Sequence, residues 1–278
     1  MAAESLFATL FPSDCRLCGA ALTEVSRLPV CCACVESVSR ISATTCAVCG
    51  ELVVSGEGTQ DEVRCGLCQR ARLPFARAVA YGSYDGALRG LIHLLKYDRV
   101  RPAADALGRL LAEAMAGLKL AAAEKAALVV PVPLAGGRER QRGFNQAEEI
   151  ARAALRRFSP TLAPKGAART WGTMAMELNT RALRRTRETQ SQTGLTRHQR
   201  RANLRGALVA ARPEQIAGRE IVLVDDVYTT GTTVSECARV LRRAGAAEIY
   251  VATVARVMKG EAPAVAAEEF EVSARVQA

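Results

Sequence analysis

The chain has 278 residues, enough for one full α/β domain and a small additional module. Hydrophobic residues make up 49% of it and charged residues 24%, which is ordinary for a soluble globular protein. The net charge of +10 favours anionic partners such as polyphosphates or nucleic acid, while an aromatic content of 4% argues against base stacking on many exposed rings. No run has membrane-spanning length and the apolar start lacks a signal peptide's basic flank, so we expect a cytoplasmic location.

Four C-x-x-C pairs stand near the amino terminus. They are Cys15/Cys18, Cys31/Cys34, Cys46/Cys49 and Cys65/Cys68. Each pair can present two thiolates to a tetrahedral Zn²⁺, and the short loops between pairs are typical of zinc ribbons. We expect two structural zinc sites, the first two pairs around one ion and the last two around the other, although the spacing also permits an interleaved arrangement. Cys32 is left over, and Cys237 is expected to be a buried structural residue.

After a basic connector, the chain alternates between strand and helix patterns. Residues 76–86 read as a strand with a turn, and 87–97 as an amphipathic helix with an apolar face of Leu88, Leu91, Ile92 and Leu95. His93 and Lys96 are expected on other faces of that helix, and we assign His93 no catalytic role. An Ala/Leu-rich helix at 103–120 should pack on the sheet.

A buried strand at 127–132 precedes a loop that is rich in arginine and glycine. This loop, LAGGRERQRGFNQ, brings Arg138, Arg140, Arg142 and Asn145 to the mouth of the next helix. Its guanidinium and backbone N–H groups suit a diphosphate, and a solvated charged loop is the alternative. Farther on, 159–172 reads as a flexible excursion.

Residues 181–205 carry eight arginines against one glutamate. Such a run can bind nucleic acid, lie exposed in solvent, or close as a mobile lid over an anionic ligand. A short strand is expected directly after it, at 206–211.

Two adjacent carboxylates, Asp225 and Asp226, follow a short buried strand at 221–224. The turn after them supplies hydroxyls and closely spaced backbone N–H groups at the start of a helix, where the helix dipole favours a phosphate. That turn consists of Thr229, Thr230, Gly231, Thr232 and Thr233. Carboxylates beside a phosphate cradle suit a sugar phosphate, bound directly or through Mg²⁺. Because ligands bind at the carboxyl ends of strands in α/β sheets, this turn and the loop after 132 can face one crevice.

The stretch LVDDVYTTGTT resembles the 5-phosphoribosyl diphosphate (PRPP) signature of type I phosphoribosyltransferases. Together with the cysteine pairs, LIHLLKY, VVPVP, RGFNQA and the R-x-R-x-T-x-x-Q segment, it is similar to the ComF/GntX family. The resemblance implies an α/β fold, a Rossmann-like parallel sheet flanked by helices, with a small amino-terminal zinc-ribbon domain. We expect the zinc ribbons at 1–72, the phosphoribosyltransferase-like domain at 73–258 and a tail at 259–278.

The resemblance also assigns a PRPP site. It puts Asp225 and Asp226 at the ribose and the turn at the 5-phosphate. It puts Arg142, Gly143 and Asn145 near the diphosphate. It assigns to the flexible loop that covers the diphosphate Arg185, Arg187, Thr189 and Gln192. Thr229 stands where purine-salvage relatives carry an acid/base aspartate, which disfavours purine salvage. The segment 159–180, with Trp171, departs from the family pattern.

Two functional hypotheses follow. In the first, the protein binds PRPP and Mg²⁺ and transfers phosphoribosyl to an acceptor that the sequence leaves unnamed, in connection with DNA uptake and natural transformation. In the second, a non-catalytic accessory protein keeps a relic PRPP site and contacts single-stranded DNA or a DNA-uptake helicase. Intact phosphate loops favour ligand binding, whereas the positive charge favours nucleic acid.

Overall fold

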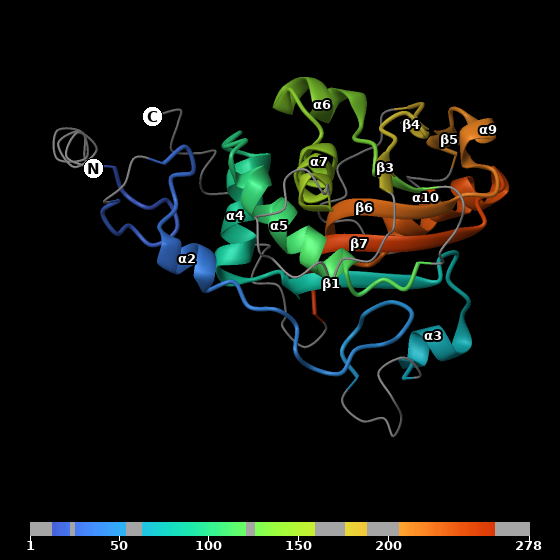
Figure 1. Ribbon diagram of the computed structural model, residues 1–278, viewed down its shortest axis with the longest axis horizontal. Coiled ribbons are helices and arrows are strands. Elements are labelled where there is room, and N and C mark those ends of the chain that lie inside the picture. The colour runs from blue at the N-terminus through green and yellow to red at the C-terminus, as the bar shows by residue number, and fades with distance from the viewer. Residues whose placement is uncertain are drawn as a thin grey trace, which may run out of the picture.

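A parallel sheet of five strands forms the centre of the computed structural model, which describes residues 13–22, 26–53, 63–120, 126–158, 176–187 and 206–258. The strand order is β1-β7-β6-β2-β3 (Figure 1). The strands are β1 (Arg77–Ser83), β2 (Ala127–Pro131), β3 (Met176–Leu178), β6 (Glu220–Tyr228) and β7 (Glu248–Arg256). Their nearly continuous apolar runs suit strands that are buried on both faces. A parallel sheet flanked by helices is therefore confirmed.

Helices cover both faces of this sheet. The long ones are α4 (Gly86–Lys96), α5 (Ala103–Met115), α7 (Gln146–Phe158) and α10 (Thr232–Arg243). The first three pack in one core with Val222 and Val224, while α10 packs in a second core with Leu223. Figure 1 shows α5 and α7 side by side, and they approach so closely that a Cβ on Gly108 would lie 2.4 Å from that of Ala153. Within the described residues, every helix is too short or too polar to cross a membrane.

Several small elements differ from the sequence predictions. They are α2 (Cys32–Glu36), α3 (Gly66–Arg70), α6 (Gly136–Arg142), α9 (Pro213–Ile216) and the antiparallel pair β4 (Leu183–Arg185) and β5 (Leu208–Ala210). The loop prediction was wrong over 136–142, where a short helix forms despite its two leading glycines. The strand expected at 206–211 forms as β5, but it pairs with β4 outside the main sheet. The edge strand β3 was not predicted.

The strand that carries the carboxylates is longer than predicted. It does not end at Val224, because pairing with β7 continues as far as Tyr228 opposite Arg256. Pairing with β2, in contrast, stops at Pro131 opposite Val224. The two carboxylates consequently lie within β6, beyond the end of the neighbouring strand.

The cysteine-rich segment covers the outer edge of the sheet. The Ala78 N–H in β1 donates to the Val48 carbonyl at 2.7 Å, and the Ile41 N–H donates to the Tyr81 carbonyl at 2.9 Å. Figure 1 shows the chain between α2 and α3 running below β1. Covering by a loop or helix is one of the ways in which proteins protect an unpaired strand edge.

Candidate phosphate and metal sites

The connections after β2 and β6 meet at one end of the sheet. From β2 the chain moves outward to β3, and from β6 it moves in the opposite direction to β7. Ligands of open parallel sheets bind at such a switch point, outside the carboxyl ends of the strands. The neighbouring strands β2 and β6 thus bring the arginine-containing connection and the threonine-rich turn to the same end, as the sequence predicted.

The two carboxylates at this end have different surroundings. Asp226 is only 4% exposed, and its Oδ2 lies 2.6 Å from Nζ of Lys96. Its Oδ1 accepts a hydrogen bond from the Val227 N–H at 2.7 Å. Asp225 is partly exposed, and its Oδ1 accepts the Asp226 N–H at 2.9 Å. Asp226 is therefore engaged by the protein itself, whereas Asp225 is more accessible to a ligand.

Lys96 is a residue of the site that the sequence analysis missed. The lysine is the last residue of α4, and its side chain is 15% exposed. Burial opposes its charge, but the Asp226 carboxylate outweighs burial and raises the pKa of Lys96. The prediction that Lys96 lies away from the buried face was wrong. Its spacing of four residues from Ile92 and eight from Leu88 continues the apolar stripe and was the available signal.

The protonation of Asp225 responds first to its partial burial and then to the neighbouring charges. Burial, followed by the adjacent Asp226, raises the pKa of Asp225 to about 8, although Lys96 acts in the opposite direction. A carboxyl group with such a pKa gains from a cation or a hydrogen-bond donor brought by a ligand.

The turn after β6 is shaped by one glycine. Gly231 has φ +70°, and a Cβ at this position would lie 2.2 Å from the Tyr228 hydroxyl, so that only glycine fits. No side chain caps the first turn of α10, and the hydroxyls of Thr230 and Thr232 lie 2.9 Å apart. Backbone N–H groups without a capping side chain at a helix N-terminus, beside hydroxyls, form a suitable environment for a phosphate. Thr229 lies in the same turn, and Thr233 is the second residue of α10.

The connection after β2 holds its polar side chains in protein contacts. Asn145 donates to the Val132 carbonyl and accepts the Ala147 N–H, each at 3.0 Å, so it links the end of β2 to the start of α7. Arg142 donates to Gln146 at 2.9 Å, and Gly143 ends α6 at φ +79°. These contacts give Asn145 a positioning role in the structure. The predicted diphosphate contacts of the three residues stay predictions.

The β4–β5 pair brings a buried cation to the site. Nε and Nη2 of Arg185 are buried, and neither atom has a hydrogen-bond partner among the described residues. Burial lowers the pKa of Arg185; Arg138 and Arg187 also lower it, while Asp225 opposes them. Buried polar groups are normally hydrogen-bonded, so these two atoms could donate to an anion. Thr189 and Gln192 lie outside the described residues.

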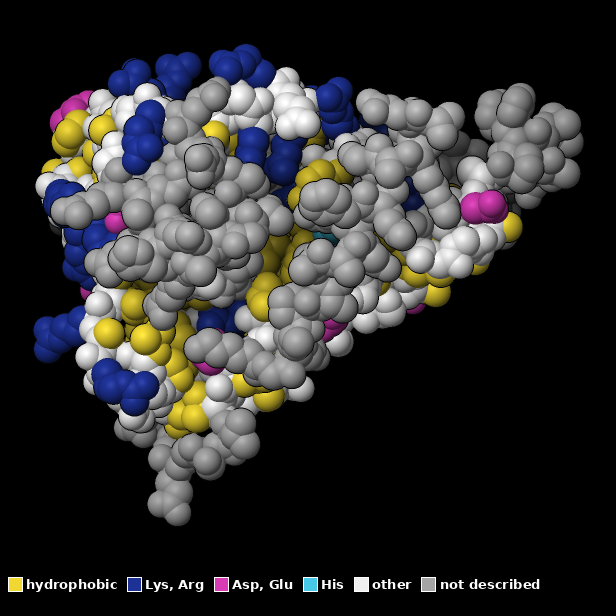
Figure 2. Space-filling model, turned by 180° about the vertical axis from the view of Figure 1, so that it is seen from behind, with side chains coloured by type: hydrophobic (Ala, Val, Ile, Leu, Met, Phe, Trp, Pro, Cys, Tyr) yellow, Lys and Arg dark blue, Asp and Glu magenta, His cyan; other side chains and the backbone are white. Residues whose placement is uncertain are grey.

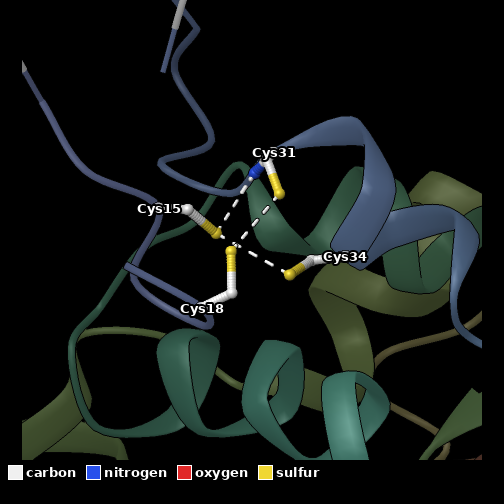
Figure 3. A group of neighbouring side chains, drawn as sticks. All are labelled: Cys15, Cys18, Cys31 and Cys34. Atoms are coloured by element: carbon white, nitrogen blue, oxygen red, sulfur yellow. Dashed lines mark hydrogen bonds between the residues drawn. The ribbon is translucent and has the colours of Figure 1, made fainter. Parts of the chain in front are cut away.

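The eight paired cysteines gather into two clusters, which follow the sequential grouping. In each cluster the sulfurs lie within 4.8 Å of one another. The first cluster contains Cys15, Cys18, Cys31 and Cys34, and the second contains Cys46, Cys49, Cys65 and Cys68. Figure 3 shows the four sulfurs of the first cluster converging from a tight turn and from the start of α2. Cys32 is exposed and Cys237 is buried, and both stay outside the clusters.

The sulfur geometry fits a tetrahedral zinc ion. Zn–S bonds of about 2.3 Å imply sulfur separations near 3.8 Å. The Cys15–Cys34, Cys18–Cys31 and Cys49–Cys65 separations are 3.9, 3.7 and 3.6 Å. Although burial raises it, N–H groups of Cys31, Cys18 and Leu17 directed at the sulfur bring the pKa of Cys15 down to about 6. In the same cluster, side-chain hydrogen bonds with Cys18 and Cys31 raise the pKa of Cys34 to about 12. The sulfur separations therefore indicate that both clusters can hold a metal ion.

Comparisons with known proteins agree with this arrangement. A family model described as "Phosphoribosyl transferase domain" matches residues 114–272, more than half of the chain. The chain is 32% identical to DNA utilization protein YhgH of Escherichia coli (strain K12) over 248 residues, which cover 89% of this chain and 98% of the relative. It is 31% identical to Competence protein F of Haemophilus influenzae over 195 residues, 69% of this chain and 78% of the relative.

The chain belongs to the ComF family. The type I phosphoribosyltransferase-like fold predicted from the sequence is thereby confirmed, and the amino-terminal cysteine clusters are consistent with zinc ribbons. This ComF-family chain is also 39% identical over 72 residues to the ribose-phosphate pyrophosphokinase of Halobacterium salinarum. That match covers 25% of each chain.

Proposed function

We propose that this ComF-family protein binds PRPP together with Mg²⁺ at the carboxyl end of its sheet. The observation that carries the proposal is the buried guanidinium of Arg185, whose Nε and Nη2 have no hydrogen-bond partner in the described part of the chain. It is close enough to Asp225 for each to affect the other electrostatically. A ligand with a polyanionic end and a polyhydroxylated centre matches such a pair of groups. The phosphoribosyl transferase domain match and the ribose-phosphate relative support the same ligand class.

Each part of PRPP has a suitable group in this site. The 5-phosphate suits the first turn of α10, which no side chain caps, and the adjacent threonine hydroxyls. The ribose hydroxyls suit Asp225, and the diphosphate suits Arg185 and its neighbour Arg138. Mg²⁺, when bound, supplies charge that stabilises the diphosphate and the carboxylates.

In a transferase, this site would support displacement of diphosphate at the anomeric carbon. The arginines would stabilise the departing diphosphate, which takes the electron pair of the broken C–O bond. The nucleophilic atom of the acceptor supplies the electron pair for the new bond to that carbon. Measuring PRPP consumption against a panel of bases and amines distinguishes the transferase from a protein that only binds PRPP.

Titration calorimetry with PRPP and MgCl₂ tests the binding site directly. We expect the wild type to bind, the Asp225→Asn/Asp226→Asn double variant to lose binding, and Arg185→Met to bind about 10- to 100-fold more weakly, since a hydrogen bond to a charged group is lost. Arg184→Met is the matched control, because Arg184 is the exposed neighbour of Arg185 in β4 and should leave the affinity unchanged. A wild type that does not bind PRPP, or equal affinities for Arg185→Met and wild type, would contradict the assignment.

We also propose that both cysteine clusters bind structural Zn²⁺. Each offers four sulfurs at separations that suit the ion, which leaves no open coordination position for catalysis. The ions would stabilise a segment whose described part contains only short helices, turns and isolated β-bridges.

A second function, contact with single-stranded DNA, is favoured by one exposed aromatic side chain. Tyr97 is 58% exposed, the guanidinium of Arg142 lies 5.5 Å from its ring centroid, and the His93 ring lies 5.1 Å away. Figure 2 shows Lys and Arg side chains along the upper edge of the molecule, where α6 lies in Figure 1. An aromatic ring beside arginines suits an unstacked base and its backbone. The names of the two relatives, DNA utilization protein and Competence protein F, agree with such a partner.

DNA binding is expected to depend on salt and on the Tyr97 ring. The affinity for an oligonucleotide, measured by fluorescence anisotropy, should fall steeply as salt rises, because counterions compete for the phosphates. Tyr97→Ala should weaken binding about 5- to 100-fold, the range for losing one stacked base. Tyr97→Phe retains the ring and should bind like the wild type. Affinity that is flat across the salt series, or equal in Tyr97→Ala, would remove DNA from the proposed partners.

A further inference from the structure

Arg256 connects the second cysteine cluster to the strand that carries the ligand site. It is the last residue of β7, it is 4% exposed, and it lies opposite Tyr228 in the sheet. Its Nη2 donates to the Glu51 carboxylate at 2.9 Å, and its Nη1 donates to the carbonyl of Cys49. The same guanidinium lies 4.3 Å from the centroid of the Tyr228 ring. One buried cation thus contacts both the cysteine cluster and the residue before the threonine-rich turn.

Tyr228 in turn supports the glycine of that turn. The ring is buried, and a Cβ on Gly231 would lie 2.2 Å from its hydroxyl and 2.5 Å from its Cζ. The phenol therefore fills the space against which Gly231 rests. A change in the position of the ring would move the turn, because packed interiors leave few voids that could absorb such a change.

The cysteine cluster fixes the two groups that Arg256 binds. Cys49 is a member of the cluster, and its carbonyl belongs to the same tight turn as Gly50, whose N–H donates to the Cys46 carbonyl at 2.9 Å. The Cys46 N–H donates to the Glu51 carbonyl at 2.7 Å, which closes the turn. With the cluster's four sulfurs drawn together, the Cys49 carbonyl and the Glu51 carboxylate point at one guanidinium. Losing that geometry would leave a buried cation with fewer partners.

We propose that Arg256 is a positioning residue through which the second cysteine cluster holds the phosphate-binding turn in place. The proposal rests on the proposed function, because it concerns the turn expected to bind the 5-phosphate. An intact cluster holds Arg256 against Tyr228, and Tyr228 holds Gly231. Loss of metal from this cluster would loosen the turn and weaken ligand binding without any change in the residues that touch the ligand.

Hydrogen exchange and calorimetry on the full chain test this coupling. Arg256→Met should speed amide exchange in residues 229–234 and weaken PRPP binding about tenfold or more, while zinc content stays at about two ions per chain. Arg219→Met is the matched control. Arg219 likewise binds a backbone carbonyl, of Ala126, and a carboxylate, of Glu177, with a side chain 16% exposed. It lies at the opposite ends of the strands, so exchange in the turn should not change even if the melting temperature falls.

A double-variant cycle separates coupling from general destabilisation. Cys65→Ser disrupts the second cluster and should speed exchange in the turn, and combining it with Arg256→Met should add little. Cys18→Ser disrupts the first cluster and should leave that exchange unchanged. Fully additive effects, equal effects of Cys18→Ser and Cys65→Ser, or an undisturbed turn in Arg256→Met would overturn the proposal.

Two further measurements cover the cases in which Arg256→Met does not fold or the wild type does not bind PRPP. If Arg256→Met does not fold, Glu51→Gln, which removes one charge and preserves the side-chain shape, carries the same expectation with a smaller effect. If the wild type binds no PRPP, the proposed function fails, but exchange in the turn still decides whether the cluster and the turn are coupled.

Discussion

Replacing Lys96 with methionine should lower the free energy of unfolding by about 3 to 5 kcal/mol, the cost of removing one partner from a buried ion pair. The Lys96 ammonium lies 2.6 Å from the Asp226 carboxylate, and the two side chains are 15% and 6% exposed. Methionine keeps most of the volume, so the loss comes from a carboxylate that remains buried without its cation. Urea unfolding followed by circular dichroism measures the change.

Two controls identify the ion pair as the cause. Adding Asp226→Asn to Lys96→Met removes the unpaired charge and should recover most of the lost stability. Arg242→Met breaks the exposed pair with Glu248, whose side chains are 43% and 36% exposed, and should cost less than about 1 kcal/mol. Equal losses in Lys96→Met and Arg242→Met would mean that the buried pair contributes no more than a surface one.

Gly231→Ala should weaken PRPP binding about 10- to 100-fold, because a shifted turn loses a hydrogen bond to the charged phosphate, worth about 1.5–3 kcal/mol. Alanine at φ +70° is strained by about 1–2 kcal/mol, and its Cβ would meet the Tyr228 hydroxyl at 2.2 Å. The turn must therefore shift away from the N-terminus of α10. Calorimetry with PRPP and MgCl₂ measures the loss.

Gly218→Ala provides the matched control for this change. Gly218 also has φ +70°, but a Cβ there would meet nothing within 4 Å, and the residue precedes β6 at its other end. It should show the strain as a lower melting temperature and leave PRPP affinity unchanged. If Gly231→Ala retained wild-type affinity, the turn would have no part in binding.

Sequence patterns predicted the features that arise from local physics. The apolar stripe of α4, with Leu88 and Leu91, follows from helical spacing. The grouping of the cysteine pairs also agrees with the prediction, because short loops bring neighbouring pairs together. In each of these cases, residues close in the chain determine the result.

Features that depend on distant contacts could not be predicted in the same way. The extension of β6 to Tyr228 depends on pairing with β7 beyond the end of β2. Lys96 reaches the site only because α4 places it beside Asp226, which is distant in sequence. Arg256 and Glu51 are likewise separated by most of the chain, and neither belongs to a recognisable motif. Helical spacing could have indicated that Lys96 is buried, but a single sequence contains no local signal for which distant residue each of these side chains contacts.

The hydrogen bonds from the cysteine-rich segment to β1 also affect whether copies of this protein can associate through their sheet edges. With Ala78 and Tyr81 already bonded to Val48 and Ile41, β1 offers these backbone groups to no other strand. Sheets with open edges tend to associate strand to strand, so this segment acts as a barrier to self-association. Removing the cysteine-rich segment would therefore leave an edge of β1 free to pair with another strand. The segment and the sheet are consequently better treated as one unit than as two independent domains.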